Sequence, residues 1–319
     1  MRANCIGSLA AKALSSDDSG ITGHVMNTFS NAFYLRTLNG ELVFVTNRPL
    51  RSPITINLDS TLNLEHLAKP LEPVYVREKE ILIGGEAFID LSRALSYQAP
   101  SNSADELRRE FAEIEKALRT VAFLLRIIDT SQSVLDPHGL AHEGMVEFMS
   151  GAVIPFRRSS TEARLREAAL KIVGLGSGFT PSGDDALGGF LAVYNSFAEA
   201  IGRAPILFDF PLLQERTNWI SAKLVDYMQH LILDEQMHRM IDSASIGDED
   251  TLVLALETLL PRGHTSGIDI SVGALLALSL IRDIAFGKEE TEIIASALGV
   301  SKAGSPSENL ISHINIKLE

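Results

Sequence analysis

Residues 22–96 alternate short apolar runs with turn residues, which is typical of closely spaced strands. The runs lie at Gly23–Phe29, Ala32–Leu38, Glu41–Thr46, Ile54–Leu58, Val74–Arg77 and Ile81–Gly84. Asn39-Gly40 stands between two of them and favours a two-residue hairpin loop. Arg77–Glu80 is typical of a second tight turn. This pattern predicts a small antiparallel β-barrel or sandwich as an N-terminal domain over residues 1–98.

The hydrophobic period changes after the polar segment 98–104. Over Asp105–Ile128 apolar residues recur at steps of three and four, which predicts a long amphipathic helix that begins at an aspartate. Further helices are expected at 139–150, 160–173, 183–201, 210–242, 248–260, 267–286 and 289–297. The pattern thus predicts a mainly α-helical domain over 105–304 and argues against alternating Rossmann-type α/β structure.

The last segment, 305–319, returns to an alternating pattern. Apolar residues alternate with polar ones over Asn309–Leu318, and we expect a C-terminal strand that could return to the N-terminal sheet. The predicted fold class is therefore α+β.

Composition narrows the class of protein. The 319 residues are 45% hydrophobic, enough for a sizeable core, and carry a net charge of −13. Without a dense basic stripe, this acidic balance argues against binding to nucleic acid or to anionic membranes. Cys5 is the only cysteine, which excludes an internal disulfide framework. The most apolar stretch, Ile268–Ile281, is too short to span a bilayer, so we expect a cytoplasmic protein.

The segment 174–189, GLGSGFTPSGDDALGG, is the strongest candidate for chemistry. Its first glycines allow positive φ and a close approach to a ligand, and Thr180-Pro181-Ser182 predicts a helix start with a capping hydroxyl. Free N–H groups at a helix start favour anions. Asp184 and Asp185 would repel a phosphate there unless a divalent cation such as Mg²⁺ bridges them.

A second loop, 261–273, repeats part of the first. Ser182 aligns with Ser266, and both loops then follow the pattern S-G-x-D-x-x-x-G before an apolar helix. Two such helix starts facing each other would form a polar cleft for a small anionic metabolite. The candidate catalytic residues are Asp184, Asp185, His264 and Asp269. The candidate ligand-binding residues are Gly176, Ser177, Gly178, Thr180, Ser182, Gly183, Arg262, Thr265, Ser266 and Gly267. The alternative is that the aspartates only cap amides and complement two helix dipoles.

With GLGSGFTPSGDDALGGFLA and RGHTSGIDISVGALLAL both present, the chain resembles a bacterial family of largely unassigned function. That family includes the H subunit of the oxamate carbamoyltransferase of allantoin degradation. The resemblance implies a role in interconverting oxamate and carbamoyl phosphate with oxalurate and phosphate, together with partner subunits. The chain lacks the Ser-Thr-Arg-Thr-Arg phosphate loop of the familiar carbamoyltransferases, so any catalysis would use other residues.

Two alternatives remain open at the level of sequence. The stretch SGDDALGGF is similar to the Gly-Asp helix start of ribokinase-type sugar kinases, which suggests a phosphoryl-transfer enzyme. Those enzymes need an alternating α/β core that the hydrophobic pattern does not predict. The other alternative is a non-catalytic scaffold or ligand-sensing subunit.

Overall fold

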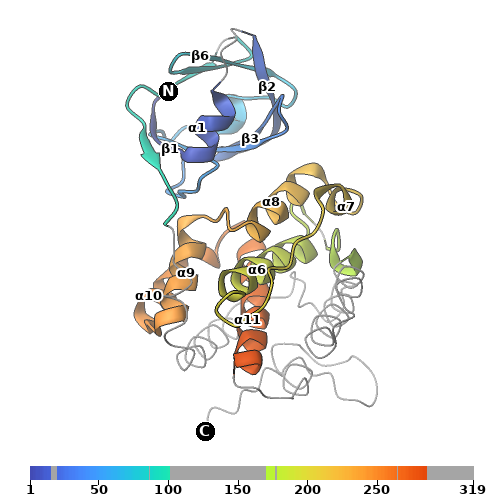
Figure 1. The fold of residues 1–319 in the computed structure, drawn as a ribbon. Helices are drawn as coiled ribbons and strands as arrows, with labels where there is room; N and C mark the ends of the chain where they lie inside the picture. The colour runs from blue at the N-terminus through green and yellow to red at the C-terminus, as the bar shows by residue number, and fades with distance from the viewer. Residues whose placement is uncertain (16–19, 86, 101–169, 177, 264, 286–319) are drawn as a thin grey trace. The chain divides into compact units, whose positions relative to one another are not determined.

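The computed structural model describes residues 1–15, 20–85, 87–100, 170–176, 178–263 and 265–285 (Figure 1). The chain divides into two compact units. The first comprises Met1–Ser101 with Ile232–Glu235, and the second comprises Asn102–Leu231 with Gln236–Glu319. The inclusion of Ile232–Glu235 in the first unit was not predicted from the sequence.

The first unit is built on one nine-stranded sheet with the order β8-β7-β6-β2-β3-β4-β5-β1-β9. The strands are β1 Ala3–Gly7, β2 Ile21–Phe29, β3 Ala32–Thr37, β4 Leu42–Thr46, β5 Thr55–Leu58, β6 Pro73–Arg77, β7 Glu80–Ile83, β8 Ala87–Asp90 and β9 Leu95–Tyr97. Most neighbours are antiparallel, but β4 pairs with β5, and β1 with β9, in parallel. The six predicted strands are confirmed, while β1, β8 and β9 were missed.

The sheet curls so that β8 approaches the start of β1. An isolated bridge joins Arg2 to Asp90, and the backbone N–H of Asp90 donates to the carbonyl oxygen of Met1 at 2.8 Å. The amino group of Met1 donates to the carbonyl oxygen of Phe88, also at 2.8 Å. Figure 1 shows the resulting ring of strands. The predicted fold class, with an N-terminal β-barrel or sandwich, is therefore confirmed, although the sheet is mixed and not purely antiparallel.

A short helix, α1 (Ser8–Leu14), packs into this barrel and was also missed. Ala10 and Leu14 belong to the same buried cluster as the strand residues Val25, Phe33 and Ile56. The chain can turn from β1 into α1 because Gly7 has no side chain. A Cβ at this position would lie 2.2 Å from the carbonyl oxygens of Ser52 and Pro53.

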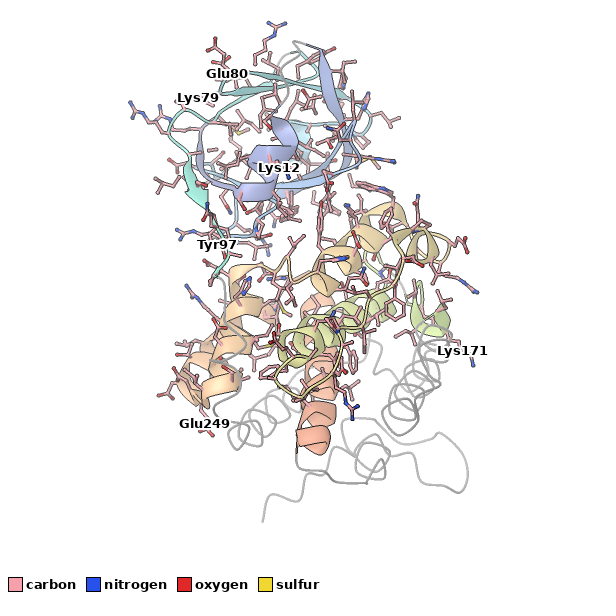
Figure 2. The ribbon with its side chains drawn as sticks, viewed as in Figure 1. Lys12, Lys79, Glu80, Tyr97, Lys171 and Glu249 are labelled. Atoms are coloured by element: carbon pink, nitrogen blue, oxygen red, sulfur yellow. The ribbon has the colours of Figure 1, made fainter. Side chains whose placement is uncertain are left out.

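Both turns predicted from the sequence are present. Gly40 has φ +75°, as the Asn-Gly pair predicts, but the loop between β3 and β4 is longer than expected. The N–H of Thr37 donates to the carbonyl oxygen of Glu41, so the loop holds residues 38–40 rather than two residues. The second turn, between β6 and β7, has Arg77 paired with Glu80, and Lys79 and Glu80 lie at its outer rim (Figure 2).

The second unit is helical, and its described residues contain no strand. Its elements are α6 Ser182–Phe197, α7 Phe210–Gln214, α8 Trp219–Gln229, α9 Glu235–Ile246, α10 Glu249–Leu259 and α11 Ser266–Ala285; the first residue of α9 is grouped with the first unit. Helix α6 is buried along nearly all of its length and lies against both α8 and α11. The predictions at 183–201, 248–260 and 267–286 are confirmed.

The prediction of one helical segment over 210–242 is wrong, because the chain forms three helices there, α7, α8 and α9. The first break separates α7 from α8. Asn218 caps the start of α8, because its side-chain oxygen accepts a hydrogen bond from the N–H of Ser221 at 3.0 Å. Leu231 has φ +59°, a left-handed conformation that no helix continues through, and it separates α8 from α9.

Several predictions concern residues outside the described ranges. These are the helices at 105–128, 139–150 and 289–297, most of the helix at 160–173, and the C-terminal strand at 305–319. Among the helices that are described, none is both long and apolar enough to cross a membrane.

Candidate functional site

The first glycine loop adopts the conformation that its sequence predicts. Gly174, Gly176 and Gly178 have φ values of +81°, +105° and +111°. At Gly174 there is also no room for a side chain, because a Cβ would lie 2.1 Å from the carbonyl oxygen of Arg216. Gly176 and Gly178 are exposed to solvent, so the backbone of this loop is accessible to a ligand.

The predicted hydroxyl cap of α6 is wrong. The N-cap residue is Pro181, which makes no side-chain cap, and its carbonyl oxygen accepts from the N–H groups of both Asp184 and Asp185. The Thr180 hydroxyl, which was expected to cap the helix, donates instead to Oδ2 of Asp185 at 2.9 Å. The Thr180 side chain therefore binds a candidate site residue and does not cap the helix.

Asp184 is buried, 1% exposed, and both of its oxygens accept hydrogen bonds from the protein. Oδ1 accepts from the N–H of Gly174 at 2.7 Å. Oδ2 accepts from the hydroxyls of Thr217 at 2.5 Å and Ser221 at 2.6 Å. Burial raises the pKa of Asp184, and the three hydrogen bonds oppose that rise. Asp184 thus joins α6 to the glycine loop and to α8.

Thr217 and Ser221 were not among the residues singled out from the sequence. They lie 33 and 37 residues from Asp184 along the chain. Both are small hydroxyl residues, one before α8 and one within it, and neither stands in a recognisable motif. Only the packing of α6 on α8 brings them to the carboxylate.

Asp185 lies at the junction of the two loops. Its side chain is 8% exposed, and burial raises its pKa to about 7. Hydrogen bonds from Ser266 and Thr180 oppose the rise, and the nearby carboxylates of Asp269 and Asp184 add to it. A carboxyl group that titrates near neutral pH can both accept and donate a proton under physiological conditions.

A hydrogen bond between Thr180 and Ser266 connects the two loops directly. Their hydroxyl oxygens are 2.9 Å apart. Each hydroxyl has a single hydrogen, so while Thr180 donates to Asp185, Ser266 directs its hydrogen either to Thr180 or to Asp185. Thr180 and Ser266 are half-buried, which places this polar junction next to solvent rather than deep in the core.

The second loop shares some features of the first. Gly263 has φ +61°, and the N–H of Gly267 donates to the carbonyl oxygen of Arg262 at 3.1 Å, as that of Gly183 does to Leu175 at 2.9 Å. Asp269 is fully buried, and its N–H donates to the carbonyl oxygen of Thr265 at 3.0 Å.

The repeated glycines bring the two helices into close backbone contact. A Cβ at Gly189 would lie 2.1 Å from the carbonyl oxygen of Ile270, and a Cβ at Gly273 would lie 1.9 Å from that of Ala186. Ala186 and Ile270 occupy equivalent positions after the two aligned serines. The contact is therefore reciprocal, and it fixes the two helix starts beside each other.

The predicted site residues fall into two groups. Thr180, Asp185 and Ser266 form one cluster, and the Asp269 carboxylate is close enough to influence Asp185. Asp184 is held separately by its own donors. Nη2 of Arg262 donates to Oε1 of Gln236 at 3.3 Å. Ser177 and His264 lie outside the described residues.

The magnesium site at Asp184 and Asp185 stays a prediction. Within the part of the chain that the structure describes, no group of three or more His, Cys, Asp or Glu side chains is arranged to hold a metal ion. The oxygens of Asp184 already accept protein hydrogen bonds, so of the two aspartates Asp185 is the better placed to contact a ligand.

Two family models match the chain over separate stretches. The model described as the AllH family N-terminal domain matches residues 2–97, which contain the barrel strands. The model described as oxamate carbamoyltransferase subunit AllH matches residues 172–278, which contain both loops and most of α11. No curated protein and no solved structure matched. These matches confirm the family resemblance inferred from the two loops.

Proposed function

The chain belongs to the AllH family, and on this basis we propose that it is a subunit of an oxamate carbamoyltransferase-type enzyme that binds a small anionic metabolite between the starts of α6 and α11. The subunit role follows from the description of the family, and it implies partner subunits in the complex. The location of the site rests on the geometry of the two loops.

One observation carries the choice of site. Thr180, Asp185 and Ser266 come from two loops far apart in the chain, yet their polar atoms are linked by hydrogen bonds of 2.9 Å beside solvent. Simple helix capping does not need this cross-loop link, and the N-cap of α6 is Pro181. The link supports a site that both helix starts contribute to.

The proposed ligands match the chemistry of this junction. Oxamate and carbamoyl phosphate each combine an anionic group with an amide. Amide N–H groups are suited to the carboxylate of Asp185, while the anionic ends are suited to the helix N-termini and to Arg262. Because carboxylates would repel an anion, we expect the anionic end of the ligand to lie against the helix N-termini and Arg262, and its amide end against Asp185.

Asp185 is the residue we assign to proton transfer. In the proposed reaction the amide nitrogen of oxamate forms a bond to the carbamoyl carbon, and the bond from that carbon to the phosphate oxygen breaks. The phosphate leaves with the bonding electron pair, and the amide proton passes to the Asp185 carboxylate. A pKa of about 7 suits this task, because a general base works best when its pKa is near the working pH.

The other two aspartates have supporting roles in this proposal. Asp269 helps to keep the pKa of Asp185 high through its negative charge. Asp184 is a positioning residue, since it ties the glycine loop to α6 and α8 through Gly174, Thr217 and Ser221. Thr180 and Ser266 orient the Asp185 carboxylate.

A ligand-sensing subunit without its own chemistry is the second candidate. It is favoured by the family description as one subunit of an enzyme, since the catalytic groups could belong to a partner. The kinase-like alternative has less support, because the described part of the second unit contains only helices and loops.

The test is an assay of carbamoyl transfer with carbamoyl phosphate and oxamate, using the chain alone and reconstituted with its partner subunits. Asp185→Asn should reduce turnover of the complex by about a hundredfold or more, in line with the usual contribution of a general base. The matched control is Asp250→Asn, an exposed aspartate in the first turn of α10, next to the outward-lying Glu249 of Figure 2.

The outcomes separate the two candidates. If Asp185→Asn removes turnover but the complex still assembles, the catalytic role is supported. If the variant loses ligand binding by this subunit while turnover persists at a reduced level, the ligand-sensing role is supported. Full turnover and unchanged ligand binding in Asp185→Asn would overturn both.

A further inference from the structure

The N-terminal barrel contains a pocket of about 500 Å³. Its walls come from Asn4 of β1, from the segment 47–51 that follows β4, and from residues 57–61 at the end of β5. This volume lies in the range of pockets that hold small metabolites. All of these residues belong to the first unit, so the pocket is distinct from the two loops of the helical unit.

A buried amide among the lining residues fixes the backbone of the pocket. Asn57 is 4% exposed, and its Nδ2 donates to the carbonyl oxygens of Arg48 at 3.0 Å and Leu50 at 2.8 Å. The adjoining backbone is fixed as well, because the N–H of Ser52 donates to Oγ1 of Thr55 at 3.0 Å. The segment that carries Arg48 and Arg51 therefore has a defined path, which lowers the entropy cost of placing its side chains on a ligand.

The charge of the lining favours an anion. The lining residues include two arginines, Arg48 and Arg51, and one acidic residue, Asp59. With its amide oxygen turned toward Arg48, Asn31 accepts from both Nε and Nη2 at 2.6 Å, and this orients the guanidinium. Asn4, Asn47 and Thr61 add neutral polar groups to the wall.

We propose that this pocket is a second ligand site, which binds a small metabolite through a phosphate or carboxylate group. Arg48 and Arg51 hold the anionic group, because the planar guanidinium matches the geometry of both oxyanions. Asp59 accepts a hydrogen bond from an N–H or O–H elsewhere on the same molecule. The proposal does not depend on the function assigned to the helical unit.

Isothermal titration of the full-length chain with inorganic phosphate and, separately, with oxalate tests this site and distinguishes the two kinds of anion. We expect one of them to bind with an affinity that falls as NaCl is added. Arg48→Gln and Arg51→Gln should each weaken that binding about tenfold or more, since each removes a charge-assisted contact. Arg77→Gln, an exposed arginine at the far end of β6, is the matched control and should bind like the native chain.

The variant Asp185→Asn separates this site from the helical one, because it should leave binding in the barrel unchanged. Both pocket arginines are exposed, so their glutamine variants should melt within a few degrees of the native chain. If one of the two glutamine variants melts at a much lower temperature than the native chain, anion binding by the other variant tests the proposal. The proposal is overturned if neither anion binds, or if binding persists in both Arg48→Gln and Arg51→Gln.

Discussion

Gly189 of α6 and Gly273 of α11 each lie against the backbone of the other helix. The position of a Cβ at Gly189 is 2.1 Å from the carbonyl oxygen of Ile270, and that of a Cβ at Gly273 is 1.9 Å from the carbonyl oxygen of Ala186. Both distances are far below normal contact, so neither helix tolerates a side chain at this point. The pair sets the spacing between the two helix starts on which the candidate site depends.

Gly189→Ala or Gly273→Ala should therefore destabilise the protein. Each added methyl group forces the helices apart, and we expect a loss of about 1–3 kcal/mol, the usual cost of overpacking a core. Thermal unfolding followed by circular dichroism measures the effect. Gly20→Ala is the control, because no atom lies within 4 Å of a Cβ at Gly20. Equal melting temperatures for all three variants would show that the helices do not need this close contact.

Asp184 should respond very differently to two substitutions. Asp184→Ala removes the acceptor of Gly174, Thr217 and Ser221 together, and we expect a loss of about 3–5 kcal/mol, typical of a broken buried network. Asp184→Asn should cost much less. Its amide oxygen can still accept from Gly174, and its NH₂ group can donate to the two hydroxyl oxygens. Urea unfolding of both variants provides the comparison.

Ligand binding by Asp184→Asn tells whether Asp184 positions the loop or contacts the ligand. If Asp184→Asn is stable and retains ligand binding, the residue acts by holding the loop. A stable Asp184→Asn chain that no longer binds ligand would instead place Asp184 in contact with the ligand.

Asp185 should make the stability of the protein depend on pH. Burial raises its pKa from the ordinary value of 3.8 to about 7, so the folded state holds a proton that the unfolded state releases. Its stabilising contribution is full below pH 3.8 and is lost as the pH rises through about 7. The slope is at most about 1.4 kcal/mol per pH unit for one group. Denaturant titrations between pH 4 and pH 8 should show a flatter profile for Asp185→Asn than for the native chain. Parallel profiles would contradict the raised pKa.

Thr180 and Ser266 should tune that titration. Hydrogen bonds from both hydroxyls lower the pKa of Asp185, so Thr180→Val and Ser266→Ala should each move the midpoint of the stability profile to higher pH. Because the two hydroxyls also bond to each other at 2.9 Å, the double variant should shift the midpoint by less than the sum of the single shifts. Strictly additive shifts would indicate that the two side chains act independently.

The sequence predicts the parts of the fold that local signals specify. Asn39-Gly40 correctly marks a hairpin, although the loop is one residue longer than expected because Thr37 pairs with Glu41. The break of the helical region at Leu231 was not predictable, since a leucine with φ +59° carries no glycine or proline signal. The short strand β1 and helix α1 were missed because closure of the barrel and burial of Ala10 and Leu14 depend on residues distant in sequence.

The candidate site was predicted only in part for the same reason. The repeated S-G-x-D-x-x-x-G pattern identifies Asp185 and Ser266, which the structure brings together through Thr180. The pattern says nothing of the role of Asp184, which comes from its hydrogen bonds with Thr217, just before α8, and with Ser221 within α8. Nor does the pattern reveal that its last glycines, Gly189 and Gly273, serve the packing of α6 against α11.

Hydrogen–deuterium exchange of the chain within its reconstituted complex, with and without carbamoyl phosphate and oxamate, tests the location of the site most directly. We expect slower exchange of backbone amides in residues 174–185 and 262–270 together when the ligands are added. Protection of the barrel segment 47–61 alone would assign binding to the other pocket. No protection of either loop, in a complex that turns over the same ligands, would contradict a site between the starts of α6 and α11.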